Sequence, residues 1–272
     1  MVTLKNTYQG MTLVELLVSL VLSAVLVIMM CNAFLLIKKN VLTGQALARV
    51  ALNARTMDYL LGKALRNSGG FDCFSLLSGV PLTADQDISL QDYGLINSRG
   101  IKGVTIEELP KHAGKRVGKR AVQNSDLLWL QWGAPYERHM TSGPIFVRAD
   151  CQKAHLTKIP TGRCSLLVSH LYYVGKTKRL NAKGKPIYAL YSTDFNGRTL
   201  ELVEGVEQLD FSYGYFLDGR LVYNKAQQIQ NWGEIVSVRL SALLNSVEEN
   251  DPKVQKWWSF EWPLMLNSQA QY

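Results

Sequence analysis

The chain has 272 residues, of which 47% are hydrophobic and 19% are charged, and its formal net charge at pH 7 is +8. This composition supplies enough apolar side chains for a packed core, so it excludes a wholly disordered chain. The length suits one membrane segment and one sizeable globular domain. The positive charge favours contact with an anionic partner, such as a phosphate backbone, a lipid headgroup or an acidic surface, but does not choose among them.

The first predicted element is an apolar run from Leu13 to Ile37, in which Glu15 is the only formal charge. A helix of this length, rising about 1.5 Å per residue, crosses a hydrocarbon core about 30 Å thick. A cleavable secretory signal peptide has a shorter apolar region, with small residues at the cleavage site that follows it. Here the polar leader MVTLKNTYQG ends at Gly10, before the run. Cleavage at this glycine would leave the membrane helix on the mature protein.

Glu15 needs an explanation, because a carboxylate in a membrane segment is costly unless a partner neutralises it. One interpretation is a glutamate near a helix end whose carboxylate reaches the lipid headgroups. The other is a functional charge, which is the default for ionisable groups within a membrane segment. The glycine-terminated leader ahead of the run favours the functional charge.

A second helical pattern follows the membrane segment without an intervening proline. Its apolar residues recur with the spacing of one buried helix face. They are Leu47, Val50, Ala51, Ala54, Met57, Leu61, Ala64 and Leu65. The sequence NSGG at 67–70 then supplies the glycine that commonly ends a helix. The spacing predicts one helix of more than fifty residues, membrane-spanning in its first half and amphipathic in its second.

Beyond Gly70 the sequence is typical of strands, because β-branched and aromatic residues become frequent. The segment QLDFSYGYFLDGRLVY predicts a hairpin that turns at Asp218-Gly219. The alternation before this turn places one set of residues on a common face: Leu209, Phe211, Tyr213 and Tyr215. In IVSVRLSALL the alternation predicts an inward set and an outward set. The inward residues are Val236, Val238, Leu240 and Ala242, and the outward ones are Ser237, Arg239 and Ser241. We expect an α+β domain in which the amphipathic half of the helix covers the apolar face of an antiparallel sheet.

The start of the chain resembles the signal of type IV prepilins, the class III signal peptides. In the segment QGMTLVELLVSLVLSAVL, Gly10 ends the leader, Met11 is the hydrophobic first residue and Glu15 is the fifth. The residue at the position of Met11 is most often phenylalanine in that family. The resemblance implies that a prepilin peptidase cleaves between Gly10 and Met11 and methylates the new amine of Met11. It also implies that Glu15 pairs with the N-terminal amine of a neighbouring subunit in a filament.

The rest of the chain resembles PilW-type minor pilins and the related J-type pseudopilins of type II secretion. The segments that carry this resemblance are LELVEGVEQLDFSYGYF, WGEIVSVRLSALLNS and WWSFEWPLML. A pilin-like fold is implied, with a leader at 1–10, a membrane and filament-core half of the helix at 11–37, an amphipathic half at 38–68 and a β-rich globular domain at 69–272.

The cysteines bear on the compartment, because positive charges at both ends of the apolar run leave its orientation open. Cys73, Cys151 and Cys164 lie in the predicted globular part, where an oxidising compartment would allow a disulfide. The alternative is three buried thiols in a cytosolic domain. The family resemblance implies a periplasmic domain with a Cys73–Cys151 disulfide. A Cys151–Cys164 disulfide, which closes a short local loop, is the alternative, since spacing does not determine connectivity.

Catalytic chemistry is not indicated. The histidines are scattered, and the sequence contains no zinc-binding HExxH or CxxC motif, no GxSxG motif and no P-loop. We therefore expect a protein that is not an enzyme and that needs no metal and no cofactor.

Positive charge is concentrated in two glycine-containing segments, KHAGKRVGKR at 111–120 and GKTKRLNAKGK at 175–185. Both are predicted to be exposed loops, which are usually plain solvated surface. A functional interpretation is an electrostatic contact with DNA or an acidic partner. In the first segment the contacting residues would be Lys115, Arg116, Lys119 and Arg120. Aromatic residues are sparse there, which argues against a DNA-binding surface.

The function implied by the resemblance is that of a minor pilin that helps to start assembly of a type IV pilus. Its expected partners are the prepilin peptidase, other minor pilins, the major pilin, the inner-membrane platform protein and the membrane itself. A J-type pseudopilin of type II secretion is the nearest alternative. A membrane-anchored periplasmic DNA- or ligand-binding protein is the alternative from another class.

Overall fold

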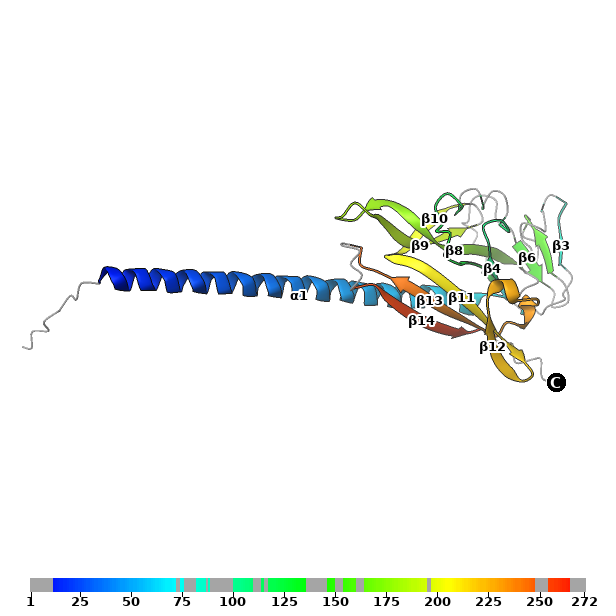
Figure 1. The fold of residues 1–272 in the computed structure, drawn as a ribbon. Coiled ribbons are helices and arrows are strands. Elements are labelled where there is room, and N and C mark those ends of the chain that lie inside the picture. The colour runs from blue at the N-terminus through cyan, green and yellow to red at the C-terminus, as the bar shows by residue number, and fades with distance from the viewer. Residues whose placement is uncertain are drawn as a thin grey trace, which may run out of the picture. The chain divides into compact units, whose positions relative to one another are not determined.

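The computed structural model describes residues 12–71, 74–75, 82–86, 88, 100–109, 114, 117–135, 146–149, 154–159, 164–194, 197–247 and 254–264. The chain divides into two compact units, residues 1–48 and 49–272. Helix α1, Leu13–Asn67, contributes its first part to the first unit and its last part to the second (Figure 1). Its 55 residues confirm the prediction of one uninterrupted helix.

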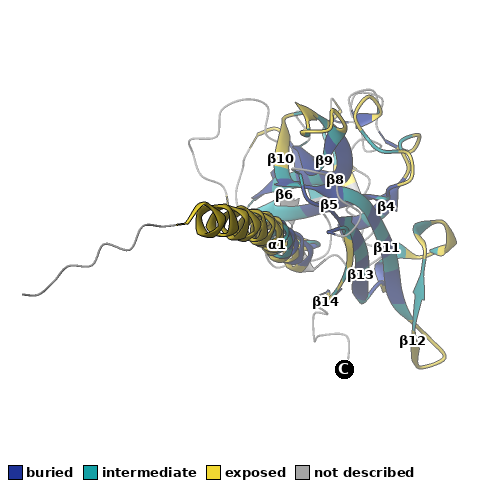
Figure 2. Ribbon diagram, turned by 60° about the vertical axis from the view of Figure 1, so that its left-hand side comes forward, coloured by how far each residue is buried: buried dark blue, intermediate teal, exposed yellow. Residues whose placement is uncertain are grey.

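In the first unit, α1 is apolar and exposed. Its large hydrophobic side chains from Leu13 to Leu42 are exposed, and its most apolar stretch has a mean hydropathy of 2.7 (Figure 2). By length and composition the helix could cross a membrane. Two serines in the run donate to backbone carbonyls of the same helix, Ser19 to Leu16 over 2.9 Å and Ser23 to Ser19 over 2.7 Å. Their hydroxyl groups are therefore satisfied without a partner from another element.

In the second unit, α1 buries the face that its spacing predicted. Val50, Ala54, Met57 and Leu61 are at most 2% exposed, whereas Arg55 is exposed. The helix ends at Asn67, and Ser68 donates to the carbonyl of Ala64 over 3.0 Å. Gly69 follows with a φ of 74°, which favours glycine, and its N–H donates to the carbonyl of Gln131 over 3.0 Å. The glycine thus ends the helix and connects it to the sheet.

The described strands of the second unit form three sheets. A small one pairs β1, Gly70–Phe71, with β2, Phe74–Ser75. The strands of the eight-stranded sheet are β3 Leu82–Ala84, β4 Ile101–Val104, β5 Leu127–Ala134, β6 Phe146–Ala149, β7 Ala154–Thr157, β8 Ser165–Leu180, β9 Pro186–Asp194 and β10 Thr199–Glu204. Those of the four-stranded sheet are β11 Val206–Leu217, β12 Arg220–Asn224, β13 Ser237–Leu244 and β14 Lys256–Pro263.

The sheets are antiparallel, as predicted, except that β3 and β7 pair in parallel. In the larger sheet the order is β10-β9-β8-β6-β7-β3, and β5 joins β4 to β8. In the smaller one it is β12-β11-β13-β14. One long helix with antiparallel sheets is the α+β, pilin-like arrangement expected from the sequence.

The predicted hairpin at Asp218-Gly219 is present. Both residues have positive φ, 51° and 75°, as the turn of a tight two-residue hairpin requires. The turn joins β11 to β12, and Leu217 pairs with Arg220 across it. Leu209, Phe211 and Tyr213 are at most 1% exposed, so the predicted apolar face of β11 is buried.

Ser237 lies on the same face of β13 as Arg239, as predicted, because Tyr223 contacts both side chains, but it is not exposed. The alternation placed this serine outward, but it is buried, with only 6% of its surface exposed. The phenol of Tyr223 on β12 lies over it, and the two hydroxyl oxygens are 2.7 Å apart. A short polar side chain at the start of a strand is thus covered by an aromatic residue from another strand of the same sheet, which the local sequence pattern does not reveal.

The second basic segment, 175–185, is also not the loop that was predicted. Strand β8 continues through it as far as Leu180, and β9 begins at Pro186, so only the turn between them lies outside the sheet. Lysines and arginines on exposed strands can extend their charged ends into water, so charge alone does not end a strand. The prediction that the segment is exposed is confirmed for Lys176, Lys178, Lys183 and Lys185.

Trp262 joins β14 to the helix. Its indole N–H donates to Asp58 Oδ1 over 2.8 Å, and a Cβ added to Gly62 would lie 2.8 Å from the same nitrogen.

We expect Gly62→Leu to lower the free energy of unfolding by about 2–4 kcal/mol, because it displaces the Trp262 indole and breaks its hydrogen bond to Asp58. Gly44→Leu is the matched control, since nothing lies within 4 Å of a Cβ at Gly44. Thermal unfolding of the detergent-solubilised full chain measures both, and equal effects would contradict the prediction.

Candidate functional site

Glu15 lies in the first turn of α1 and makes reciprocal hydrogen bonds with Thr12. The backbone N–H and the hydroxyl of Thr12 each donate to Glu15 Oε2 over 3.0 Å, and the Glu15 N–H donates to Thr12 Oγ1 over 3.3 Å. This is a capping box, in which two side chains satisfy backbone N–H groups that the helix leaves unpaired. Glu15 is thus held at the helix start by its own chain.

The charge of Glu15 is not neutralised by an ion pair within the part of the chain that the structure describes. Among residues 12–71 and the other described parts of the chain, no cation forms an ion pair with it. The positive end of the helix dipole favours a carboxylate in this turn, but by a modest amount. Only Oε2 takes part in the capping box. The carboxylate is therefore exposed and has capacity to accept from a group outside its own helix.

Thr12 is a site residue that the sequence interpretation missed. The signal was present, because TLVE at 12–15 is a threonine followed three residues later by glutamate, directly before an apolar run. Gly10 and Met11, the predicted cleavage site, lie outside the described residues. Their role stays a prediction.

Two family models match the chain. Residues 5–30 match the prokaryotic N-terminal methylation motif, and residues 171–263 match PilW, the type IV pilus-assembly protein W. The first match contains Glu15 and the start of α1, and the second contains the strands from β9 to β14. These two matches support a type IV prepilin-like minor pilin. Comparison with curated proteins and with solved structures gave no match.

The methylation-motif match and the apolar helix fit a membrane-anchored pilin. The matched families suggest a structural protein. In the described parts of the chain, no group of three or more His, Cys, Asp or Glu side chains is arranged to hold a metal ion.

The predicted disulfide of the minor pilin stays open, because Cys73 and Cys151 lie outside the described residues. Cys164 is half-buried and directly precedes β8. We expect peptide mapping under non-reducing conditions to recover Cys73 linked to Cys151, with the Cys151–Cys164 peptide as the alternative. Finding Cys73, Cys151 and Cys164 all as free thiols in periplasmic material would contradict both pairings.

The basic segments of the minor pilin, far apart in sequence, adjoin in the structure. The N–H of Lys176 donates to the carbonyl of Arg120 over 3.0 Å, and Ala121 pairs with Gly175. Lys119 and Arg120 are exposed, and the Arg120 guanidinium lies 5.9 Å from the centre of the Tyr191 ring. Lys115 and Arg116 lie outside the described residues. The structure therefore brings one half of the predicted basic set next to β8.

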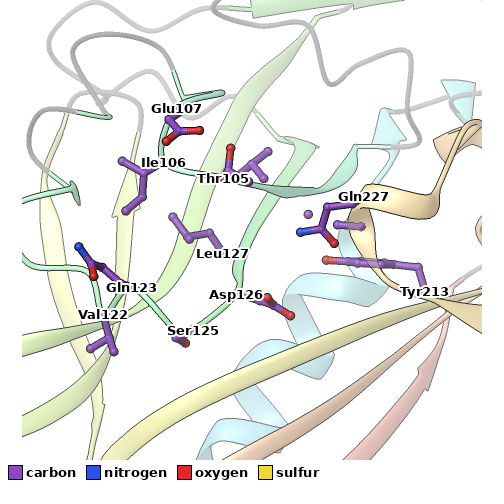
Figure 3. A pocket seen from close by; sticks show the side chains of 13 residues that line it. Thr105, Ile106, Glu107, Val122, Gln123, Ser125, Asp126, Leu127, Tyr213 and Gln227 are labelled. Carbon is purple, nitrogen blue, oxygen red and sulfur yellow. The ribbon is translucent and has the colours of Figure 1, made fainter.

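A cleft of about 480 Å³ opens beside Tyr213, lined also by Asp126, Gln227 and Gly103 (Figure 3). The Tyr213 hydroxyl is buried and has no hydrogen-bond partner among the described residues. Burial, together with the Asp126 charge, raises the pKa of Tyr213 well above its usual value. Asp126 Oδ2 accepts from the N–H of Phe211 over 2.7 Å. A phenol that stays protonated and a carboxylate bound to backbone do not form a nucleophile and base, so the cleft gives no catalytic arrangement.

Proposed function

We propose that this minor pilin enters the complex that initiates a type IV pilus, through the charge of Glu15. The observation that carries the proposal is a carboxylate on a membrane-type helix that is fixed by Thr12 but not paired with a cation in the described residues. A charge of this kind is costly in hydrocarbon unless an opposite charge is supplied. In a bundle of such helices, the opposite charge is the methylated amine of Met11 on a neighbouring subunit.

The pairing of Glu15 with a neighbour's amine also sets the register of the helices. An ion pair at membrane depth is strong only when the two groups meet, so a slip along the helix would leave both charges unpaired. The capping box supports this role, because it limits the positions of the carboxylate before a neighbour arrives. Less conformational entropy is then lost on pairing.

Processing and location follow from the same proposal. The prepilin peptidase removes residues 1–10 and methylates Met11, residues 11–37 remain in the inner membrane, and residues 69–272 lie in the periplasm. The amphipathic part at 38–68 connects the two. The partners are other minor pilins, the major pilin and the platform protein, and the mature subunit occupies the tip or another low-abundance position of the pilus.

The test is deletion of the chain followed by complementation. We expect the deletion strain to lose most surface pili while its major pilin stays in the membrane, and the wild-type chain to restore them. The chain should also appear in sheared filament fractions and co-purify with other minor pilins. Loss of protein secretion with normal pili would indicate the pseudopilin alternative. Absence from all filament fractions would indicate a permanently anchored binding protein.

A further inference from the structure

The hairpin between β8 and β9 ends in a well-defined basic turn. Asn181 Oδ1 accepts from the N–H groups of Lys183 and Lys185 over 3.0 and 2.8 Å. The N–H of Asn181 donates to the carbonyl of Lys185 over 2.9 Å, and Gly184 has a φ of 72° that suits glycine. The turn is therefore held by backbone groups and the Asn181 side chain, and these bonds do not involve the lysine side chains.

Most of the positive charge on this hairpin is not neutralised by neighbouring groups. Glu201 and Glu204 on β10 both bind Arg179, the latter over 2.9 Å. In the described parts of the chain no carboxylate pairs with the exposed lysines of the hairpin, which are Lys176, Lys178, Lys183 and Lys185. Leu180 lies among them with 66% of its surface exposed. Lysines around an exposed leucine match a surface of anionic headgroups above hydrocarbon.

The basic turn lies at the end of the second unit where α1 enters. The Asn53 side chain donates to the carbonyl of Glu204 over 2.9 Å, and Glu204 binds Arg179, so Arg179 is near the first turns of the helix in this unit. Strand β8 ends at Leu180, one residue beyond Arg179, and the turn at 181–185 follows directly. Figure 1 shows its closed end, in light green, extending away from the end of α1 at Asn67.

The distance to a bilayer is limited by the chain itself. Residues 38–48 separate the apolar run from the second unit, and as a helix they span roughly 16 Å. The second unit is therefore joined to the membrane segment by a link of 11 residues, 38–48, which keeps the hairpin at a high effective concentration near the bilayer.

We infer that the closed end of the β8–β9 hairpin binds the anionic lipid headgroups of the membrane that holds α1. The occupant is a phospholipid surface, recognised by the four exposed lysines and by Leu180. This contact holds the globular domain against the bilayer before the subunit leaves for the filament. It depends on membrane anchoring but not on the proposed role in initiation.

The test uses the full chain in nanodiscs. A fluorophore incorporated as an unnatural amino acid at Ala182, an exposed turn residue, reports energy transfer to labelled lipid headgroups. We expect higher transfer in discs with roughly one-third phosphatidylglycerol than in discs of phosphatidylcholine alone, because each lysine near an anionic surface raises affinity roughly fivefold. In about 0.5 M NaCl the difference should disappear, because the Debye length falls to about 4 Å.

Replacing Lys176, Lys178, Lys183 and Lys185 by glutamine should remove the difference at low salt. The matched control replaces Lys63, Arg66, Arg198 and Arg220 by glutamine, which removes the same charge from exposed positions away from the hairpin. This control should behave like the wild type. Equal energy transfer in neutral and anionic discs would overturn the inference. It would also be overturned if both sets of substitutions acted alike, or if the hairpin lysines bound DNA with a salt-dependent affinity while lipid composition had no effect.

Discussion

Replacing Glu15 by leucine is expected to leave the minor pilin cleaved and stably inserted but to exclude it from the initiation complex. Insertion should be unchanged or improved, because the substitution removes a costly group from the membrane segment. Assembly should fail, because the Met11 amine of a neighbouring subunit then has no opposite charge. An unpaired buried charge costs about 3–5 kcal/mol, so co-purification with other minor pilins should fall by at least about 100-fold.

Two further variants separate the charge of Glu15 from its capping role. Glu15→Gln keeps an acceptor for Thr12 and so retains the capping box, but it carries no charge. Thr12→Val removes the capping hydroxyl and keeps the charge, at a cost of about 1 kcal/mol in helix stability. If the charge is what assembly needs, the glutamine variant should fail like leucine and the valine variant should assemble. Glu15→Asp should fall between them, since its shorter side chain misplaces the carboxylate.

The measurement is co-purification with partner minor pilins together with a count of surface pili. Normal assembly by both neutral variants, leucine and glutamine, would show that the charge of Glu15 is not required. Failure of Thr12→Val together with success of Glu15→Gln would instead assign the function to the cap.

The helix could be predicted because its signals are local. An apolar run, a repeat of apolar residues and the glycines at 69 and 70 lie along one segment, and the structure follows them from Leu13 to Asn67. The β11–β12 turn was equally predictable, since Asp218-Gly219 suits the positive φ angles that such a turn needs. In both cases the conformation depends on residues close together in the chain.

The sequence was least informative where distant segments decide the outcome. Ser237 is buried because Tyr223 from another strand covers it. The basic segment at 175–185 is mostly strand because β9 pairs with it. Trp262 reaches Asp58 across 204 positions of sequence, and no local pattern indicates that bond. Thr12 is different, because its signal is local and was visible in TLVE.

Blocking the cleavage site is expected to have the other large effect. In the wild type, intact-mass analysis should show loss of residues 1–10 and one methyl group on Met11 when the prepilin peptidase is present. A bulky side chain at Gly10, as in Gly10→Phe, should prevent cleavage by steric exclusion from the peptidase. Gly10→Ala is the matched control, because it adds a single methyl group and should still be cut to a measurable extent.

The uncleaved variant should insert but never assemble, and its defect should differ from that of Glu15→Leu. The capping box is formed by Thr12 and Glu15, which both lie after the cleavage site, so the start of α1 is expected to be the same in both forms. The uncleaved chain lacks the free amine at Met11. Its Glu15 carboxylate can still pair with the amine of a neighbouring subunit, but it has no amine to pair with the Glu15 carboxylate of another neighbour. Both variants should therefore be absent from sheared filaments. The uncleaved variant should remain in the membrane at full precursor mass, whereas Glu15→Leu should remain there at mature mass. A mature N-terminus located after the apolar run would contradict the assignment of the prepilin signal.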